Sequence, residues 1–230
     1  MTMNALESTV PPMVIGRYFD ADGKRQPLPF SALELERGRR FMMRILRSFH
    51  FHTGSNVLVT SIFDESAQQL AAERAIMAYG MVVVNADATP FDANRIESIT
   101  RRFKLAGALG ISADTLAGLR NLGFAPEKIF ADMVVWARPG AYEQLVDLAG
   151  VNAHRWLEVG PAIALECNAR AGAHFDHFEW LLEAEGGEIL VTSRLERAQA
   201  FQRVRSGVRG RIEHGTCACG NPDPRIVLTA

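Results

Sequence analysis

The order of apolar and polar positions divides most of the chain into alternating helical and extended segments. Residues 31–49 place most of their large apolar side chains on one face of a helix and arginines on the other, which indicates an amphipathic helix. Ser31 followed by Glu34 is a capping-box start for this helix. The short apolar run 56–61 that follows is typical of a buried strand.

The same pair of elements recurs along the chain. Further helices are expected at 65–80, 92–104, 113–123 and 140–150, and further strands at 81–86, 105–112, 129–137 and 155–160. Helices that alternate with short, nearly continuous apolar strands are typical of a parallel sheet covered on both faces. The pattern therefore predicts an α/β fold whose sheet is mostly parallel and carries helices on both faces.

The pattern changes after about residue 160. Residues 177–195 form two apolar runs around Glu185-Gly186-Gly187, which is a hairpin signal. Further short runs alternate with glycine and proline turns, so we expect a β-rich end. We accordingly divide the chain into an N-terminal arm, residues 1–30, an α/β core, residues 31–160, and a β-rich subdomain, residues 161–230.

Composition and charge narrow the class of protein. The 230 residues are 48% hydrophobic and 22% charged, which excludes a disordered chain. Lys and Arg number 25 against 26 Asp and Glu, and a net charge of −1 supplies no basic field for nucleic acid or anionic lipid. No apolar run approaches the ~18 residues of a membrane span, and the first residues lack a secretory signal pattern. We expect a cytoplasmic protein that binds neither nucleic acid nor membranes.

Candidate metal ligands gather in the β-rich end. Cys167 and His174 are spaced as C-x6-H, and Cys217 and Cys219 lie in the glycine-flanked turn TCACG. Zinc prefers thiolate and imidazole ligands, and four protein ligands are typical of a structural site. The spacing leaves two alternatives open, a structural zinc site and three buried thiols without metal. Two further histidines compete as ligands, His177 and His214.

Residues 187–226 resemble the end of the large N-terminal domain of phenylacetate-coenzyme A ligases, which belong to the adenylate-forming superfamily. The stretch contains GEILVT, an arginine-rich run and TCACG before an Arg-Ile pair, similar to the family's GELVLT strand, RTGD-like motif and CPCGR. Upstream, residues 156–174 resemble the family's YGLTE segment and the Glu-Cys and His that follow it. Residues 55–112 look like the sheet after its phosphate-binding loop.

This resemblance also bears on the metal. The ligases carry the same Cys, His and Cys-x-Cys arrangement as a metal site. The resemblance therefore implies that Cys167, His174, Cys217 and Cys219 hold a structural zinc that stabilises the β-rich subdomain.

The chain departs from the family where the nucleotide binds. The family's loop is rich in Ser, Thr and Gly and ends in Gly-Lys-Pro; its nearest equivalent here, FDADGKRQP at 19–27, lacks the hydroxyls and adds aspartates that would repel phosphate. In the YGLTE-like segment, Leu157 replaces the threonine, His154 replaces the tyrosine, and Glu158 remains. Val208 stands where the family's aspartate binds the ribose hydroxyls. We therefore describe 1–30 as an arm with a degenerate phosphate-loop region, and expect no ATP or AMP cofactor.

The sequence thus predicts a degenerate acyl- or aryl-CoA ligase-like protein, which binds a small carboxylate or acyl thioester without ATP-dependent adenylation. If it is an enzyme, its chemistry is altered. Ligands of open parallel sheets bind beyond the carboxyl ends of the strands. We expect Glu158 and His154 as an acid–base pair and Trp156, Asp87 and Trp136 as substrate-binding residues. The alternative for Glu158 is a relic carboxylate paired with an arginine.

Two other functions remain open. One is a noncatalytic pseudoenzyme subunit that pairs with itself or with a full-length ligase. The resemblance implies a truncated large domain that lacks the family's C-terminal domain, so surfaces that this domain normally covers would be exposed. The other is an acid–thiol ligase that works with a separate C-terminal domain in trans. A homo-oligomer or a ligase partner is therefore expected alongside the small-molecule ligand.

Overall fold

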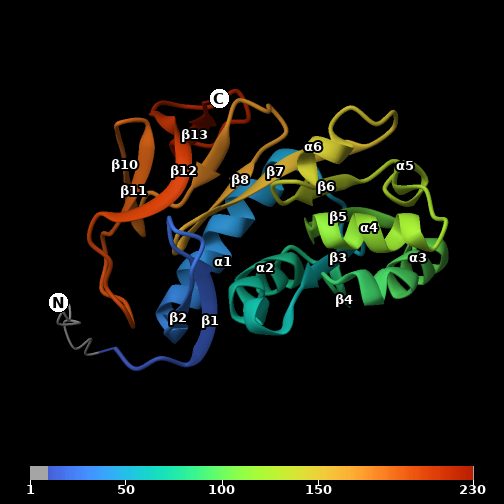
Figure 1. The fold of residues 1–230 in the computed structure, drawn as a ribbon, viewed down its shortest axis with the longest axis horizontal. Coiled ribbons are helices and arrows are strands. Elements are labelled where there is room, and N and C mark those ends of the chain that lie inside the picture. The colour runs from blue at the N-terminus through green and yellow to red at the C-terminus, as the bar shows by residue number, and fades with distance from the viewer. Residues whose placement is uncertain (1–9, 230) are drawn as a thin grey trace.

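The computed structural model describes residues 10–229, whose strands form one sheet of two strands and one of eleven (Figure 1). Half of the larger sheet is parallel, and its strands lie in the order β4-β3-β5-β6-β7. They are β3 (Asn56–Ser61), β4 (Val82–Asp87), β5 (Leu105–Ile111), β6 (Val134–Ala137) and β7 (Asn152–Val159). This half confirms the predicted parallel sheet.

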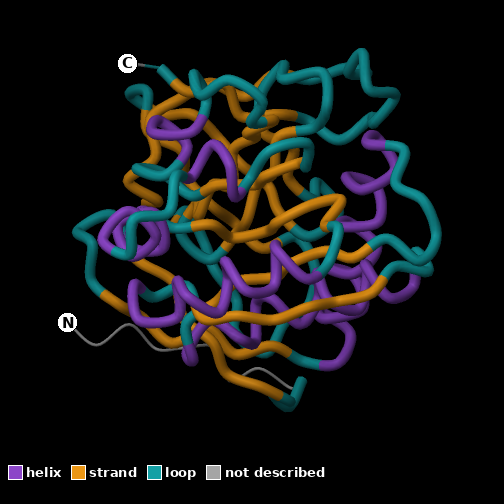
Figure 2. Tube along the Cα trace, turned by 90° about the vertical axis from the view of Figure 1, so that its right-hand side faces the viewer, coloured by secondary structure: helices purple, strands orange, loops and turns teal. Residues whose placement is uncertain are grey.

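Helices cover both faces of the parallel half. On one face, α1 (Ala32–Leu46) and α2 (Ser66–Ala78) pack their apolar sides against β3, β6 and β7. On the other face lie α3 (Ala93–Arg102), α4 (Ala113–Asn121), α5 (Pro126–Ile129) and α6 (Tyr142–Leu145). Figure 2 shows the strands crossing the middle of the molecule with helices outside them. Three short 3-10 helices complete these connections: η1 (Arg47–Phe49), η2 (Phe63–Glu65) and η3 (Pro90–Asp92).

Beyond β7 the sheet continues with antiparallel strands, orange to red in Figure 1. They are β8 (Ala162–Glu166), β9 (Ala173–Phe175), β10 (Trp180–Glu185), β11 (Glu188–Ser193), β12 (Val204–Glu213) and β13 (Arg225–Leu228). From β7 outward their order is β8-β9-β13-β12-β11-β10. The predicted hairpin is confirmed, because Gly186 and Gly187 adopt φ of 58° and 82° between β10 and β11.

The N-terminal hairpin is formed by β1 (Val14–Phe19) and β2 (Arg25–Phe30). Leu28 is buried in the core of the antiparallel half, which anchors the hairpin beside α1. The segment 19–27, whose sequence resembles a phosphate loop, contains the hairpin turn. Asp20 caps this turn, since its Oδ1 accepts from the backbone N–H of Asp22 at 3.1 Å and of Lys24 at 2.9 Å.

The helix starts predicted from sequence agree best with the structure. The predicted bounds are wrong for one strand and one helix. Ser31 caps α1 with the capping box expected of Glu34, and α1 itself is confirmed. The strand predicted from residue 129 begins instead at Val134, because Pro126 opens the short helix α5. The helix predicted over 140–150 is a single turn, since the chain turns back toward β7 after Leu145. Among residues 10–229, we find no helix long and apolar enough to cross a bilayer.

Candidate functional site

A cavity of about 100 Å³ lies between the N-terminal hairpin, α1, α2 and the strands β7 and β8. Three of its lining residues come directly from the ends of parallel strands: Glu65 follows β3, Arg138 follows β6, and Glu158 lies near the end of β7. Ligands of open α/β sheets bind at this edge. Much of the remaining wall is apolar, with Leu28, Phe30, Leu35, Phe41 and Met42 among its residues.

Two arginines and two glutamates form a charged cluster at one wall of the cavity: Arg17, Glu65, Arg138 and Glu158. Arg138 donates to both carboxylate oxygens of Glu65, at 2.5 and 2.6 Å, and to Glu158 Oε1 at 3.1 Å. Arg17 pairs with Glu65 and lies 3.5 Å from Glu158 Oε2. Glu65 is nearly fully buried, whereas 30% of the Glu158 side chain is exposed. Glu158 is thus the member of the cluster that solvent or a ligand reaches most readily.

The surroundings of Glu65 keep it ionised. Burial, the largest single influence, raises its pKa, but Arg138, the Ile62 backbone N–H and Arg17 together outweigh burial and hold the pKa below the usual value. Arg138 is fixed in turn by donating from Nε to the carbonyl of Gly110 at 3.1 Å. Gly110 occupies an irregularity in β5 with φ of 85°, and a Cβ there would lie 2.5 Å from the Thr60 carbonyl oxygen. Only glycine fits this bend, which therefore helps to position Arg138.

Several buried polar atoms at the cavity lack a hydrogen-bond partner, and those of Trp156 and Gln69 are among them. Trp156 and Gln69 are each 1% exposed and both line the cavity. Neither the Trp156 Nε1–H nor the Gln69 Oε1 has a hydrogen-bond partner. Trp136, on the neighbouring strand, instead donates its Nε1–H to the Glu166 carbonyl at 2.9 Å. An unpaired buried donor or acceptor costs roughly 1–3 kcal/mol, so these two atoms need an explanation.

The residues expected from sequence as an acid–base pair are separated. His154 and Glu158 share one face of β7, but they are four residues apart and Trp156 lies between them, so their Cα atoms are about 13 Å apart. His154 is buried with its ring 4.8 Å from that of Phe49, and it does not line the cavity. Burial lowers the pKa of His154 to about 3, so its imidazole is neutral near pH 7.

The three residues expected to bind substrate also occupy different places. Trp156 lines the cavity. Trp136 is fully buried in the core between the sheet, α1 and α2. Asp87 is exposed at the end of β4, where it borders a separate surface hollow beside α2. The structure therefore brings Trp156 and Glu158 together at the cavity and leaves the other candidates outside it.

Several cavity residues escaped the sequence analysis, among them Arg17, Glu65, Gln69 and Arg138. A signal existed for two of them. Glu65 lies in η2 just beyond the carboxyl end of β3, and Arg138 directly follows β6, so both stand where polar side chains are candidates for ligand contacts. Nothing in the local sequence marks Arg17 or Gln69, which reach the cavity through the docking of the hairpin and α2.

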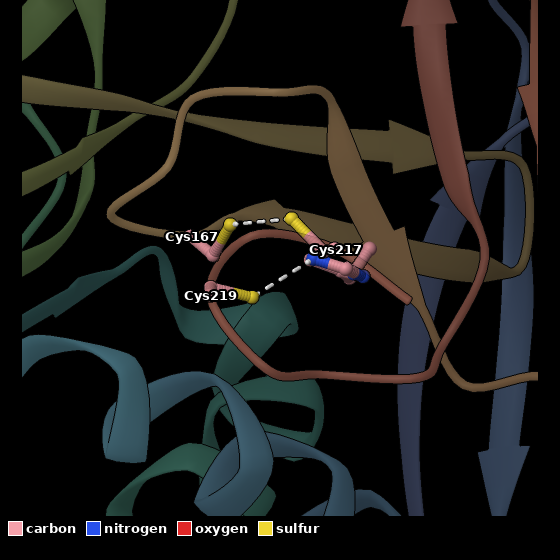
Figure 3. Close-up of side chains that lie close together, drawn as sticks. Cys167, Cys217 and Cys219 are labelled. Carbon is pink, nitrogen blue, oxygen red and sulfur yellow. Dashed lines mark hydrogen bonds between the residues drawn. The ribbon is translucent and has the colours of Figure 1, made fainter. Parts of the chain in front are cut away.

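A second candidate site is the Cys3His cluster, formed by Cys167, His174, Cys217 and Cys219. Cys167 follows β8, His174 lies in β9, and the other two cysteines lie between β12 and β13. Figure 3 shows Cys167 and Cys217 directed toward one another; their sulfurs are 3.7 Å apart, and Cys219 Sγ is 3.5 Å from His174 Nε2. All four donor atoms lie within 4.8 Å of one another.

The arrangement fits a tetrahedral metal ion. Thiolates at about 2.3 Å from zinc lie about 3.8 Å apart in a regular tetrahedron, close to the spacing of Cys167 and Cys217. His174 donates from Nδ1 to the Asp223 carbonyl at 2.7 Å, which leaves Nε2 as the atom available to a metal. Four protein ligands leave no open position for a substrate. The Cys3His cluster could therefore hold a metal ion in a structural role.

The competing histidines are placed elsewhere. His177 Nδ1 lies 2.6 Å from Asp223 Oδ1, and neither His177 nor His214 belongs to the group of converging donors. Asp223 also accepts from Arg44 Nε at 2.6 Å. The loop that carries Cys217 and Cys219 is thereby tied to α1, which forms part of the cavity wall.

Comparisons of the whole chain with known proteins identify its fold. No protein-family model and no curated protein sequence matches it. Among solved structures, 2-hydroxyisobutyryl-CoA ligase in complex with 2-HIB-AMP and CoA matches with a TM-score of 0.67 at 14% identity, over 94% of this chain and 56% of the ligase. The N-terminal subdomain of Klebsiella oxytoca NpsA, in complex with 3-hydroxyanthranilyl-AMSN, matches with a TM-score of 0.59 at 12% identity, over 94% and 62%.

The chain thus has the fold of adenylate-forming acyl-CoA ligases. It spans about half the length of 2-hydroxyisobutyryl-CoA ligase, between 50% and 56% in different structures of that enzyme. Because that ligase carries an AMP adduct, the likeness gives no support to the expectation that this chain lacks an ATP or AMP cofactor.

Proposed function

We propose that the chain binds a small carboxylic acid or its thioester in the cavity, and that it does not adenylate the acid without further protein. The observation that carries the proposal is an apolar cavity that meets Arg138, at the carboxyl end of β6, and Arg17, which lies in β1 of the N-terminal hairpin. Apolar walls suit the body of a small acid, and guanidinium groups bind carboxylates strongly. Glu158 makes the longest contacts to Arg17 and Arg138, so a ligand carboxylate would take its place between them.

Two features support the absence of unaided adenylation. The backbone N–H groups of the hairpin turn, which would have to bind phosphate, are already used, because Asp22 and Lys24 donate to the Asp20 side chain and Gly23 donates to its carbonyl. A phosphate would have to displace the Asp20 carboxylate. Magnesium requires free oxygen ligands, and Glu65 and Glu158 are paired with arginines.

Calorimetry and thermal shift with the full chain test this proposal. Benzoate, short alkanoates and their CoA thioesters should bind or raise Tm, whereas ATP with Mg²⁺ alone should not. A shift with ATP and Mg²⁺ would instead favour a ligase that works with a separate domain in trans. If none of these ligands binds or changes Tm, and the chain forms a concentration-dependent dimer, the noncatalytic subunit would be favoured.

Two substitutions sharpen the test at the charged cluster. Glu158→Gln removes the anion that competes for Arg17 and Arg138, so it should tighten carboxylate binding several-fold. Arg17→Gln should weaken it about tenfold, since a charge-assisted hydrogen bond is lost while Arg138 still pairs with Glu65. Arg155→Gln is the matched control, because Arg155 stacks on Tyr142 and does not line the cavity. Equal effects of Arg17→Gln and Arg155→Gln would contradict the proposed carboxylate position.

We also propose that the metal of the Cys3His cluster is one structural zinc ion. Three thiolates and one imidazole are a donor set that zinc prefers, and the absence of an open position suits a role in folding. Elemental analysis of purified protein should find one zinc per chain. Purified protein without stoichiometric metal would refute the assignment.

A further inference from the structure

We propose that the ligand of the cavity carries a hydroxyl group, separate from its carboxylate, which accepts a hydrogen bond from Trp156 Nε1–H and donates one to Gln69 Oε1. This inference rests on the proposed binding of an acid or thioester in the cavity. It names the class of ligand as a small hydroxy acid.

Trp156 Nε1–H and Gln69 Oε1 are among the buried polar atoms of residues 10–229 that lack a hydrogen-bond partner. Buried polar groups in folded proteins nearly always have partners, and an orphan costs roughly 1–3 kcal/mol. Trp136, which shares the face of the sheet with Trp156, has its partner at 2.9 Å. Tryptophans in this core can therefore be paired, and the unpaired one is the one that lines the cavity.

The two unpaired atoms complement each other chemically. One is a donor and the other an acceptor, and both residues line the same cavity. A hydroxyl is the smallest group that accepts and donates at once. A carboxylate only accepts, and an ammonium group only donates. We therefore assign one ligand hydroxyl to both atoms.

The proposed hydroxyl is separate from the acidic end of the ligand. The carboxylate has its own cationic partners in Arg17 and Arg138, whereas neither Trp156 nor Gln69 is hydrogen-bonded to the charged cluster. The ligand would then be held at two points, with its apolar body against the intervening wall. A site built to hydrogen-bond a hydroxyl discriminates strongly against analogues that lack it, because its own polar atoms are left unpaired.

Calorimetry on the metal-loaded full chain tests the inference with matched ligands. The 2-, 3- and 4-hydroxybenzoates are compared with the fluorobenzoates of the same ring position, which cannot donate. The formylbenzoates, which accept but do not donate, form the third set, and butanoate with its 3- and 4-hydroxy derivatives covers aliphatic acids. At least one hydroxy acid should bind tenfold or more tightly than its counterpart lacking the donor.

Substitutions test whether Trp156 and Gln69 cause the preference for hydroxy acids. Trp156→Phe and Gln69→Leu should each reduce the ratio of hydroxy to fluoro affinity toward one while the fluoro acid still binds. Trp136→Phe, whose indole lies outside the cavity, should leave the ratio unchanged.

The outcomes separate this inference from the proposed function. If hydroxy and fluoro acids bind equally, or formyl acids bind as tightly as hydroxy acids, the hydroxyl is not recognised and the inference is overturned while acid binding stands. A preference that survives both Trp156→Phe and Gln69→Leu would likewise overturn it. If none of these acids binds, and benzoate, the short alkanoates and their CoA thioesters do not bind either, the proposed function itself fails.

Discussion

Trp136 and Trp156 lie on the same face of the sheet, yet only one of their indole N–H groups is hydrogen-bonded. That of Trp136 is paired with a carbonyl, and that of Trp156 is left unpaired at the cavity that Gln69 also lines. Proteins keep such unpaired groups mainly where function requires them, at a cost in stability. The cavity wall is therefore expected to be a place where substitution by an apolar residue stabilises the unliganded chain.

Gln69→Leu should raise the free energy of unfolding by about 1 kcal/mol, because it removes an unsatisfied buried amide oxygen. Trp136→Phe should lower it by about 1–3 kcal/mol, because the Glu166 carbonyl loses its donor. Urea unfolding of both variants without ligand measures the difference. A loss of stability in Gln69→Leu comparable to that in Trp136→Phe would mean that Gln69 is satisfied in the unliganded chain.

The ionised carboxylate of Glu65, paired with Arg138, should make the free energy of unfolding depend on pH. The folded pKa of Glu65 lies below its unfolded value, so the ionised carboxylate contributes stability above the unfolded pKa and loses it as the pH falls through the folded pKa. Glu65→Gln should therefore cost about 3 kcal/mol at pH 7, and this deficit should shrink by pH 3.5.

Urea unfolding of both proteins at the two pH values measures this change. Any metal lost in acid is lost from both chains, so their difference isolates Glu65. A deficit that stays constant with pH would show that the carboxylate charge is not what stabilises the fold.

The two candidate sites differed in how far the sequence could predict them. Cysteine and histidine are few, so Cys167, His174, Cys217 and Cys219 could be gathered from residue type, and the structure brings their donor atoms together. Arginine and glutamate are common on surfaces, and the charged cluster joins residues as far apart as Arg17 and Glu158. Only the tertiary fold selects which of them converge.

At the scale of elements, the periodicity of apolar residues predicted the helices and strands whose formation depends on their own sequence. The amphipathic pattern located α1, and the apolar runs located β3 and β5, because burial of one helix face or of a whole strand leaves a readable pattern. The hairpin β1–β2 went unpredicted as an element, since Pro27 and Pro29 interrupt its second strand. Its formation depends on packing against α1 and α2.

The irregularity in β5 provides a test at this scale. Gly110→Ala should destabilise the chain by about 3 kcal/mol, because φ of 85° is unfavourable for alanine and its Cβ would clash with the Thr60 carbonyl. The control is Gly123→Ala, which has φ of 80° but nothing within 4 Å of the added atom, and should cost about 1 kcal/mol. Thermal unfolding compares them. Equal costs would show that backbone conformation alone matters and that β5 tolerates the clash.

At the scale of the whole molecule, one strand joins the two halves. β7 is parallel to β6 on one side and antiparallel to β8 on the other, so it contributes both to the edge that holds the cavity and to the half that holds the Cys3His cluster. Arg44 of α1 further connects the cavity wall to Asp223, near the cluster. Loss of the proposed metal should therefore affect the cavity wall as well as the loops that carry the Cys3His cluster.

Removal of the metal by a chelator should lower Tm, with a loss of several kcal/mol in the free energy of unfolding, because binding to the assembled site is coupled to folding. Cys217→Ser should have a similar effect. Hydrogen exchange should accelerate first over 167–174 and 214–224, while β3 and β5 remain protected. An unchanged Tm after complete removal would show that the Cys3His cluster does not stabilise the fold.

β4 has a further consequence for the behaviour of the chain in solution. Within residues 10–229 it pairs only with β3, so its outer side presents unpaired backbone groups beside the run Val82–Val83–Val84. An apolar strand at the rim of a sheet is a template on which another extended chain can add. The exposed Asn85 and Asp87 at its end oppose such addition. When the protein is concentrated or partly unfolded, aggregation should begin at this rim.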